Sequence, residues 1–255
     1  MSRAVFLLLR VLRFFAALLL ANFLTVASAP AQEVQQHGLV LETWVRDTFF
    51  DGYKPASYTQ KWDIPAAANK TQGGIPVNPK ATKYGTPVDL GDALRQIKID
   101  EPFILVIGFW RQEADVKRFV NIVAPRIDPA AWKKLWGPVT RADLEKLDAT
   151  VKDKSLTPEQ ARAAAQKIKN APPFTSSIIE VNPKIDSKTQ RRLQCSLRFD
   201  DVFKYLAPDA DSRPQAPASA RGVVGRGVSA GDSVEAARVE ALKRAVLACF
   251  LFRQD

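Results

Sequence analysis

The stretch KWDIPAAANKTQGGIPVNPKATKYG, from Lys61 to Gly85, decides the fold of this chain. Asp63 follows an aromatic residue, a loop comes next, and an apolar strand then runs into Asn78-Pro79-Lys80. Two strands joined by a loop are expected to lie side by side, which would bring the acid within a few ångströms of the lysine. The alternative is a turn-capping aspartate and a lysine on a solvated strand end.

The segments around this stretch predict alternating helices and strands. Apolar residues at helical spacing predict a helix over 38–51. The continuous apolar run 102–110 is typical of a buried central strand, which 116–124 would join through a polar turn. The remaining expectations are strands over 57–64 and 74–83 and a short helix over 88–98. Two prolines within 74–83 favour an edge strand or a bulge there.

The second half of the chain predicts three helices and then two strands. The helices begin at Asp128-Pro129, at Thr140 with Asp143, and at Thr157-Pro158 with Gln160. Strands are expected over 176–182 and 191–199, and the second of these alternates apolar and polar residues. A last short helix is expected over 200–206.

The two ends of the chain differ from its middle. A positive segment, an apolar run over 14–26 and small residues at 29–31 indicate a secretory signal peptide over 1–31. The protein would then be periplasmic or secreted and contact the membrane only through that signal. If the true start lies near Gln35, it would be cytoplasmic. Residues 207–221 are rich in Pro, Ala and Ser and read as a linker, and 222–255 as an Ala-rich helical tail.

Composition and rare residue types narrow the chemistry. The chain carries 37 Lys and Arg against 27 Asp and Glu, a balance that favours phosphate backbones or anionic lipids as partners. His37 is the single histidine and no Gly-x-Ser-x-Gly is present, so catalysis would rest on carboxylates, lysine and a metal. No phosphate-loop motif occurs, and no small organic cofactor is expected. Cys195 and Cys249 would either form one disulfide or be two small buried residues.

These residues resemble the PD-(D/E)XK restriction-endonuclease-like superfamily. The resemblance covers roughly residues 35–206 and implies an α/β (α+β, mixed-sheet) fold with an αβββαβ core, here carrying a helical insertion and the C-terminal helical tail. It implies that Asp63 is the first acid, that Asn78-Pro79-Lys80 is the second half of the motif, and that Glu42 is the extra acid of the first helix. The domain would span 32–206.

The implied activity is that of a magnesium-dependent deoxyribonuclease. Asp63, Glu42 and Asp92 would hold Mg²⁺ or Mn²⁺, and Lys80 would orient the attacking water. The chain departs from the family at Asn78, a neutral and weaker ligand where the family has a carboxylate. Asp89, Asp92 or Glu42 would replace that acid. Three further residues, Asn78, Gln96 and Lys83, would support the catalytic site.

DNA is the expected partner. Lys188, Arg191, Arg192 and Arg198 could follow a phosphate backbone, and the alternative for them is a solvated strand face. Two functions remain open at this point: an endonuclease, or a non-catalytic exported envelope protein that uses a nuclease-like fold for binding or scaffolding. The sequence also leaves a homodimer open.

Overall fold

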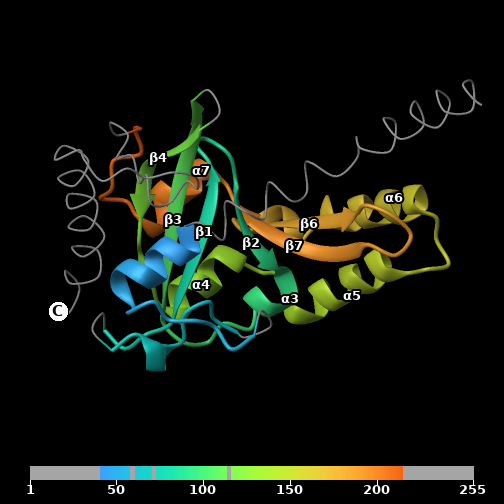
Figure 1. Ribbon diagram of the computed structural model, residues 1–255. Helices are drawn as coiled ribbons and strands as arrows, with labels where there is room; N and C mark the ends of the chain where they lie inside the picture. Colours follow the sequence, from blue (N-terminus) through green and yellow to red (C-terminus); the bar gives the residue numbers. More distant parts are fainter. Residues whose placement is uncertain (1–40, 58–60, 71–72, 114–115, 215–255) are drawn as a thin grey trace, which may run out of the picture. The chain divides into compact units, whose positions relative to one another are not determined.

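The computed structural model describes residues 41–57, 61–70, 73–113 and 116–214 (Figure 1). The chain divides into two units, Met1–Leu39 and Val40–Asp255, and all described residues lie in the second. The predicted signal peptide, residues 215–221 of the predicted linker, the predicted tail, His37 and Cys249 lie outside the described residues.

The first sheet is built around the long strand β3 (Phe103–Glu113). It pairs in parallel with β1 (Val77–Lys83) and antiparallel with β4 (Val116–Val123) and β5 (Arg126–Ile127). Successive β3 side chains enter two different hydrophobic clusters, because strand residues alternate between faces. Both faces of β3 are therefore covered, which confirms the central strand that its apolar run predicts.

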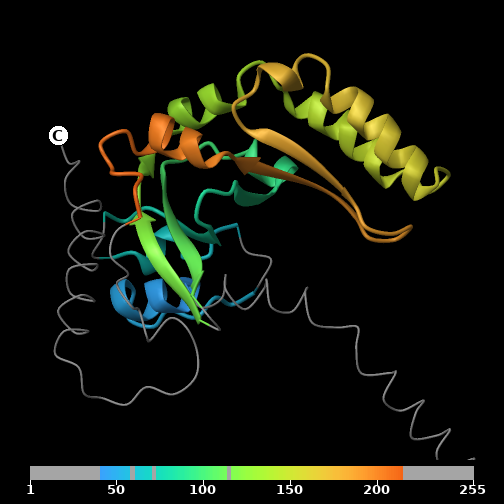
Figure 2. The same ribbon diagram turned by 90° about the horizontal axis from the view of Figure 1, so that it is seen from above.

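A helix over residues 41–49 covers one face of this sheet (Figure 2). Leu41, Val45 and Phe49 are buried at helical spacing against that face. Gly108 allows the close approach, since a Cβ there would lie 2.6 Å from Phe119 Cε1 and 3.0 Å from Leu41 Cδ2. The packing of this helix also fixes the position of Glu42, the residue that follows Leu41.

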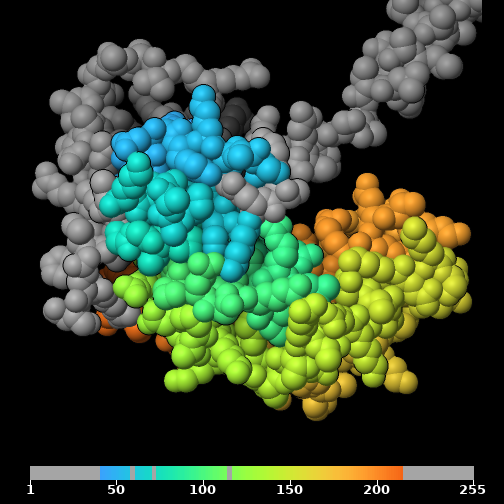
Figure 3. All heavy atoms as spheres, turned by 90° about the horizontal axis from the view of Figure 1, so that it is seen from below, coloured from blue at the N-terminus to red at the C-terminus, as the bar shows by residue number. Residues whose placement is uncertain are grey.

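The second sheet is antiparallel and has the order β2 (Val88–Asp92), β7 (Arg191–Leu197), β6 (Glu180–Ile185). Helices α5 (Arg141–Lys152) and α6 (Pro158–Lys169) contact β7 and β6, and both begin with the capping boxes that the sequence predicts. Figure 3 shows the α5 region, in yellow-green, forming a continuous surface with the β2–α3 region in green. The other described elements are η1 (Ala66–Ala68), α3 (Ala93–Gln96), α4 (Pro129–Trp136), η2 (Phe174–Ser176), α7 (Phe199–Asp201) and η3 (Val202–Leu206).

Three sequence-based expectations differ from the structure. The strand predicted over 176–182 is shifted along the chain, because β6 begins only at Glu180 and Ser176 ends η2. The helix predicted over 88–98 is wrong in its first half, which forms β2, and only α3 is helical. Val88 and Leu90 are buried while Asp89 between them is exposed, and this alternation is that of a strand. Among the described residues of 57–64, strand pairing is limited to an isolated antiparallel bridge between Ile64 and Val77.

The described chain thus combines a mixed sheet, an antiparallel sheet and packed helices, which is an α+β fold. No helix in the described segments is long and apolar enough to cross a membrane. The start of the predicted linker packs against the first sheet. Tyr84 Oη donates to Ser212 O at 2.8 Å, and the amide of buried Asn121 donates to Asp211 O at 2.7 Å.

Candidate active site at the edge of the first sheet

Asp63 is carried by a short segment that is anchored on both sides. Trp62 and Ile64 are buried, and they enter the two different hydrophobic clusters. Ile64 N donates to Val77 O at 3.1 Å, and Val77 N donates to Ile64 O at 2.8 Å. This bridge ties the segment to the edge of the sheet and places Asp63 beside β1.

Asn78 and Lys80 project from β1 toward Asp63. They are two residues apart, so they lie on the same face of the strand. Lys80 Nζ lies 3.2 Å from Asp63 Oδ2 and 3.1 Å from Pro79 O, and it also contacts Asn78 Oδ1. The expected proximity of the acid and the lysine is therefore observed.

Glu42 reaches the same site from the helix over 41–49. Burial raises the pKa of its carboxyl, and the negative charge of Asp63 raises that pKa further. Arg46 and Lys80 oppose this rise, and Arg46 Nη1 lies 2.6 Å from Glu42 Oε1. The charges of Asp63 and Lys80 therefore both act on the pKa of Glu42, whose side chain is only 20% exposed.

The site has a balanced set of charges. Glu42 and Asp63 contribute two negative charges, Arg46 and Lys80 contribute two positive charges, and Asn78 adds a neutral amide oxygen. Carboxylate and amide oxygens are ligands that Mg²⁺ and Mn²⁺ accept, so this donor set fits one hard divalent ion. Among the described residues, no three His, Cys, Asp or Glu side chains gather closely enough to hold a metal ion.

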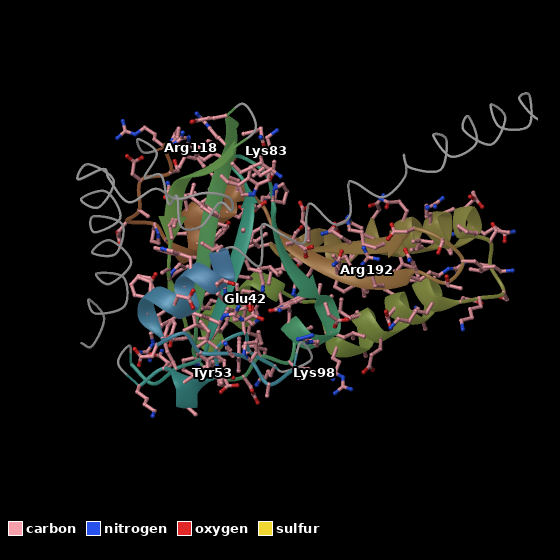
Figure 4. All side chains as sticks on the ribbon, in the orientation of Figure 1. Glu42, Tyr53, Lys83, Lys98, Arg118 and Arg192 are labelled. Carbon is pink, nitrogen blue, oxygen red and sulfur yellow. The ribbon has the colours of Figure 1, made fainter. Side chains whose placement is uncertain are left out.

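Two residues predicted to belong to the site lie at the end of β2 and in α3 instead. Asp92 Oδ1 accepts a hydrogen bond from Arg95 N at 2.8 Å and caps α3. Gln96 Nε2 donates to Leu90 O at 2.8 Å, and Gln96 O accepts from Trp132 Nε1. Both side chains thus organise the β2–α3 corner. Lys83 is exposed at the end of β1, well away from Glu42 in Figure 4.

The cations predicted to contact DNA have different environments. Arg191 is buried, and its guanidinium donates to the carbonyl oxygens of Val151, Asp153 and Leu156. It therefore joins β7 to the end of α5 and is not available to a phosphate. Arg198 is bound by Asp201 at 2.6 Å.

Arg198 and the other two predicted cations are exposed. Arg192 pairs with Asp186 at 2.8 Å, with both side chains about half exposed, and Figure 4 shows it on the β6–β7 hairpin. Lys188 is exposed in the turn of that hairpin. Of the four, Lys188, Arg192 and Arg198 are therefore accessible to a polyanion, whereas buried Arg191 is not.

Arg46 at this site and Glu101 beside it are not among the site residues predicted from the sequence. Arg46 stands four residues after Glu42, and this spacing on a helix predicts an ion pair between the two side chains. Glu101 contacts Lys61 and Trp62 across 40 and 39 residues, and no local pattern predicts such a contact. Cys195 is buried, and desolvation raises the pKa of its thiol well above the ordinary value.

Comparison with known proteins adds no relative: no protein-family model, curated protein or solved structure matches this chain significantly.

Proposed function

We propose that this protein is a metal-dependent deoxyribonuclease with a divergent restriction-endonuclease-like site. The observation that supports the proposal best is the contact of Lys80 Nζ with Asp63 Oδ2 at 3.2 Å, beside Asn78 and within the electrostatic reach of Glu42. Asp63 and Glu42 would hold Mg²⁺ or Mn²⁺, and Asn78 would add its amide oxygen.

The roles of the side chains follow from their charges. A bound divalent ion lowers the pKa of its water and offsets charge on the phosphate in the transition state. Lys80, held at the carboxylate, would orient the attacking water and stabilise the developing negative charge. Arg46 holds Glu42 and limits the repulsion between the two carboxylates.

The element order gives partial support to the proposed core. A helix, the Asp63 segment, β1 and the parallel strand β3 follow one another as in the αβββαβ arrangement. The segment between β1 and β3 departs from it, because β2 joins the second sheet rather than continuing the first. Helices α4, α5 and α6 would form the helical insertion.

Exposed cations at two places would serve as contacts for DNA. Lys83 and Arg111 lie at one end of the first sheet, where Arg111 stacks on Tyr84 at 4.5 Å. Lys188 and Arg192 lie on the β6–β7 hairpin. The formal net charge of +10 favours a polyanionic partner, and phosphate contacts of this kind are independent of base sequence.

A non-catalytic exported protein is the second candidate function. The observation that favours it is the charge balance of the site, in which Lys80 and Arg46 already neutralise both carboxylates and Asn78 contributes no charge. In that case the ion pairs would serve to join the helix, the Asp63 segment and β1.

The test uses the full chain, freed of metal by chelation and then mixed with supercoiled plasmid and Mg²⁺ or Mn²⁺. Removal of a metal-binding or water-orienting group is expected to reduce nicking by about 10²-fold or more in Asp63→Ala and Lys80→Ala. Lys133→Ala, which removes an exposed lysine on α4, is the matched control. Metal-independent nicking, or equal nicking by all variants, would reject the enzyme. Salt-sensitive DNA binding without nicking would leave a binding protein.

A further inference from the structure

The segment that carries Asp63 is held by a contact outside the site. Glu101 Oε1 accepts hydrogen bonds from Lys61 Nζ at 2.6 Å and from Trp62 Nε1 at 2.9 Å. Asp100 Oδ1 lies 3.6 Å from the same Lys61 ammonium. The two residues that directly precede Asp63 are thus both bound by one carboxylate oxygen.

The indole of Trp62 links this contact to the core of the protein. Trp62 is 6% exposed, and its ring packs against Phe103, the first residue of β3, with 5.1 Å between ring centroids. Glu101 stands two residues before Phe103, so one short region of chain supplies both the packing surface and the acceptor for this indole. The rotation of the Trp62 side chain is thereby fixed at both its ring and its N–H.

The Glu101 contact fixes the orientation of the Lys61–Trp62 segment more than it stabilises the fold. The Lys61 and Glu101 side chains are 51% and 42% exposed, and exposed ion pairs contribute little to stability. A hydrogen bond from an indole to a carboxylate is charge-assisted and directional. The hydrogen bonds from Lys61 and then Trp62 lower the pKa of Glu101, so it remains ionised as the acceptor at neutral pH.

We propose that Glu101 is a positioning residue for Asp63. It holds the chain on the Trp62 side, the bridge to Val77 holds it on the Ile64 side, and the two restraints together direct the Asp63 carboxylate at Lys80. The consequence for catalysis rests on the proposed function, whereas the geometric claim does not.

The geometric claim is tested by lysine labelling of the full chain with an amine-reactive reagent and mass spectrometry. Lys80 is held by Asp63 and should react more slowly than exposed Lys83 on the same strand. The ratio of Lys80 to Lys83 labelling is expected to rise at least threefold in Glu101→Ala and in Trp62→Phe, which keeps a ring in the core but removes the N–H donor. Glu101→Gln keeps an acceptor oxygen and should stay within twofold of the wild type.

Two further variants calibrate the measurement. Asp63→Ala sets the ratio for a Lys80 that has lost its carboxylate partner, and Glu145→Ala, which breaks an exposed ion pair with Arg141 on α5, should leave the ratio unchanged. Circular dichroism confirms that each variant is folded at the labelling temperature. An unchanged ratio in folded Glu101→Ala and folded Trp62→Phe would overturn the proposal.

Plasmid nicking separates this proposal from the proposed function. A misplaced Asp63 should lower kcat by about 10- to 100-fold in Glu101→Ala with little change in KM for DNA, and Glu101→Gln should restore most of kcat. A changed labelling ratio in a protein whose wild type does not nick DNA would reject the enzyme and keep the positioning role. Normal nicking by folded Glu101→Ala would reject the positioning role and keep the enzyme.

Discussion

Replacement of Arg191 by alanine tests whether this arginine stabilises the fold or contacts DNA. Arg191 is 9% exposed, and its guanidinium donates to the carbonyl oxygens of Asp153 and Leu156, the latter at 2.8 Å, with a longer contact of 3.4 Å to Val151 O. Loss of two hydrogen bonds from a charged donor, at about 1.5 kcal/mol each, should lower the free energy of unfolding by about 3 kcal/mol. For a domain of this size that corresponds to a fall in Tm of about 6–12 °C.

The neighbouring Arg192→Ala variant is the matched control. Arg192 is about half exposed and paired with Asp186. Its removal should lower the free energy of unfolding by between 0 and about 1 kcal/mol and shift Tm by at most about 4 °C. Thermal unfolding followed by circular dichroism measures both shifts. Fluorescence anisotropy with duplex DNA, at a temperature where both variants are folded, should show weaker binding for Arg192→Ala and not for Arg191→Ala. An Arg191→Ala protein that melts like the wild type but loses DNA affinity would refute the reasoning.

Four further predictions concern the site and its support. Asn78→Asp turns the balanced site into one with net negative charge, so calorimetry should show Mn²⁺ affinity at least about tenfold higher; an unchanged affinity would exclude Asn78 from the metal shell. Gly108→Ala places a Cβ 2.6 Å from Phe119 Cε1, and overpacking of about 1–3 kcal/mol should lower Tm, whereas an unchanged Tm would contradict the close approach of the helix. Because burial raises the pKa of Glu42, Mn²⁺ binding should weaken as pH falls through that raised pKa, at a higher pH than for an ordinary glutamate. The raised pKa also means that ionised Glu42 lowers the free energy of unfolding as pH rises through it. Without metal, Glu42→Gln should therefore raise Tm more at pH 8 than at pH 4. The double variant Lys83→Gln/Arg111→Gln should reduce the slope of log affinity against log salt by about 2 for duplex DNA, and Lys133→Gln/Lys134→Gln, an equal change in charge on α4, should not.

Local patterns in the sequence predict much of the fold. The capping residues Thr140 and Thr157 locate α5 and α6 because a cap depends on residues only three positions away. The apolar run of β3 signals burial on both faces for an equally local reason. The helix prediction for 88–98 is wrong in its first half because only the second half is helical. The first half is a short strand, whose partner β7 lies far along the chain.

The candidate site is predictable only in part. Asp63 and Lys80 meet because one bridge joins two neighbouring segments, which the sequence suggests. Asp92 fits the sequence pattern equally well, yet its carboxylate caps α3, and no pattern distinguishes a cap from a ligand at that position. Glu101 and Arg191 contact residues 35 or more positions away, and no local sequence pattern indicates such pairs.

The pairing of β2 with β7 has a consequence for how the chain reaches its native state. Val88 pairs with Leu197, and these residues are 109 positions apart (197 − 88), so the second sheet closes only after nearly the whole domain has been made. Loops of this length make strand pairing slow, and until β7 arrives β2 presents an unpaired edge. A chain that ends before residue 191 would therefore keep the Asp63–Lys80 region but expose a strand edge prone to aggregation. Interrupted synthesis should yield insoluble fragments rather than a smaller working domain.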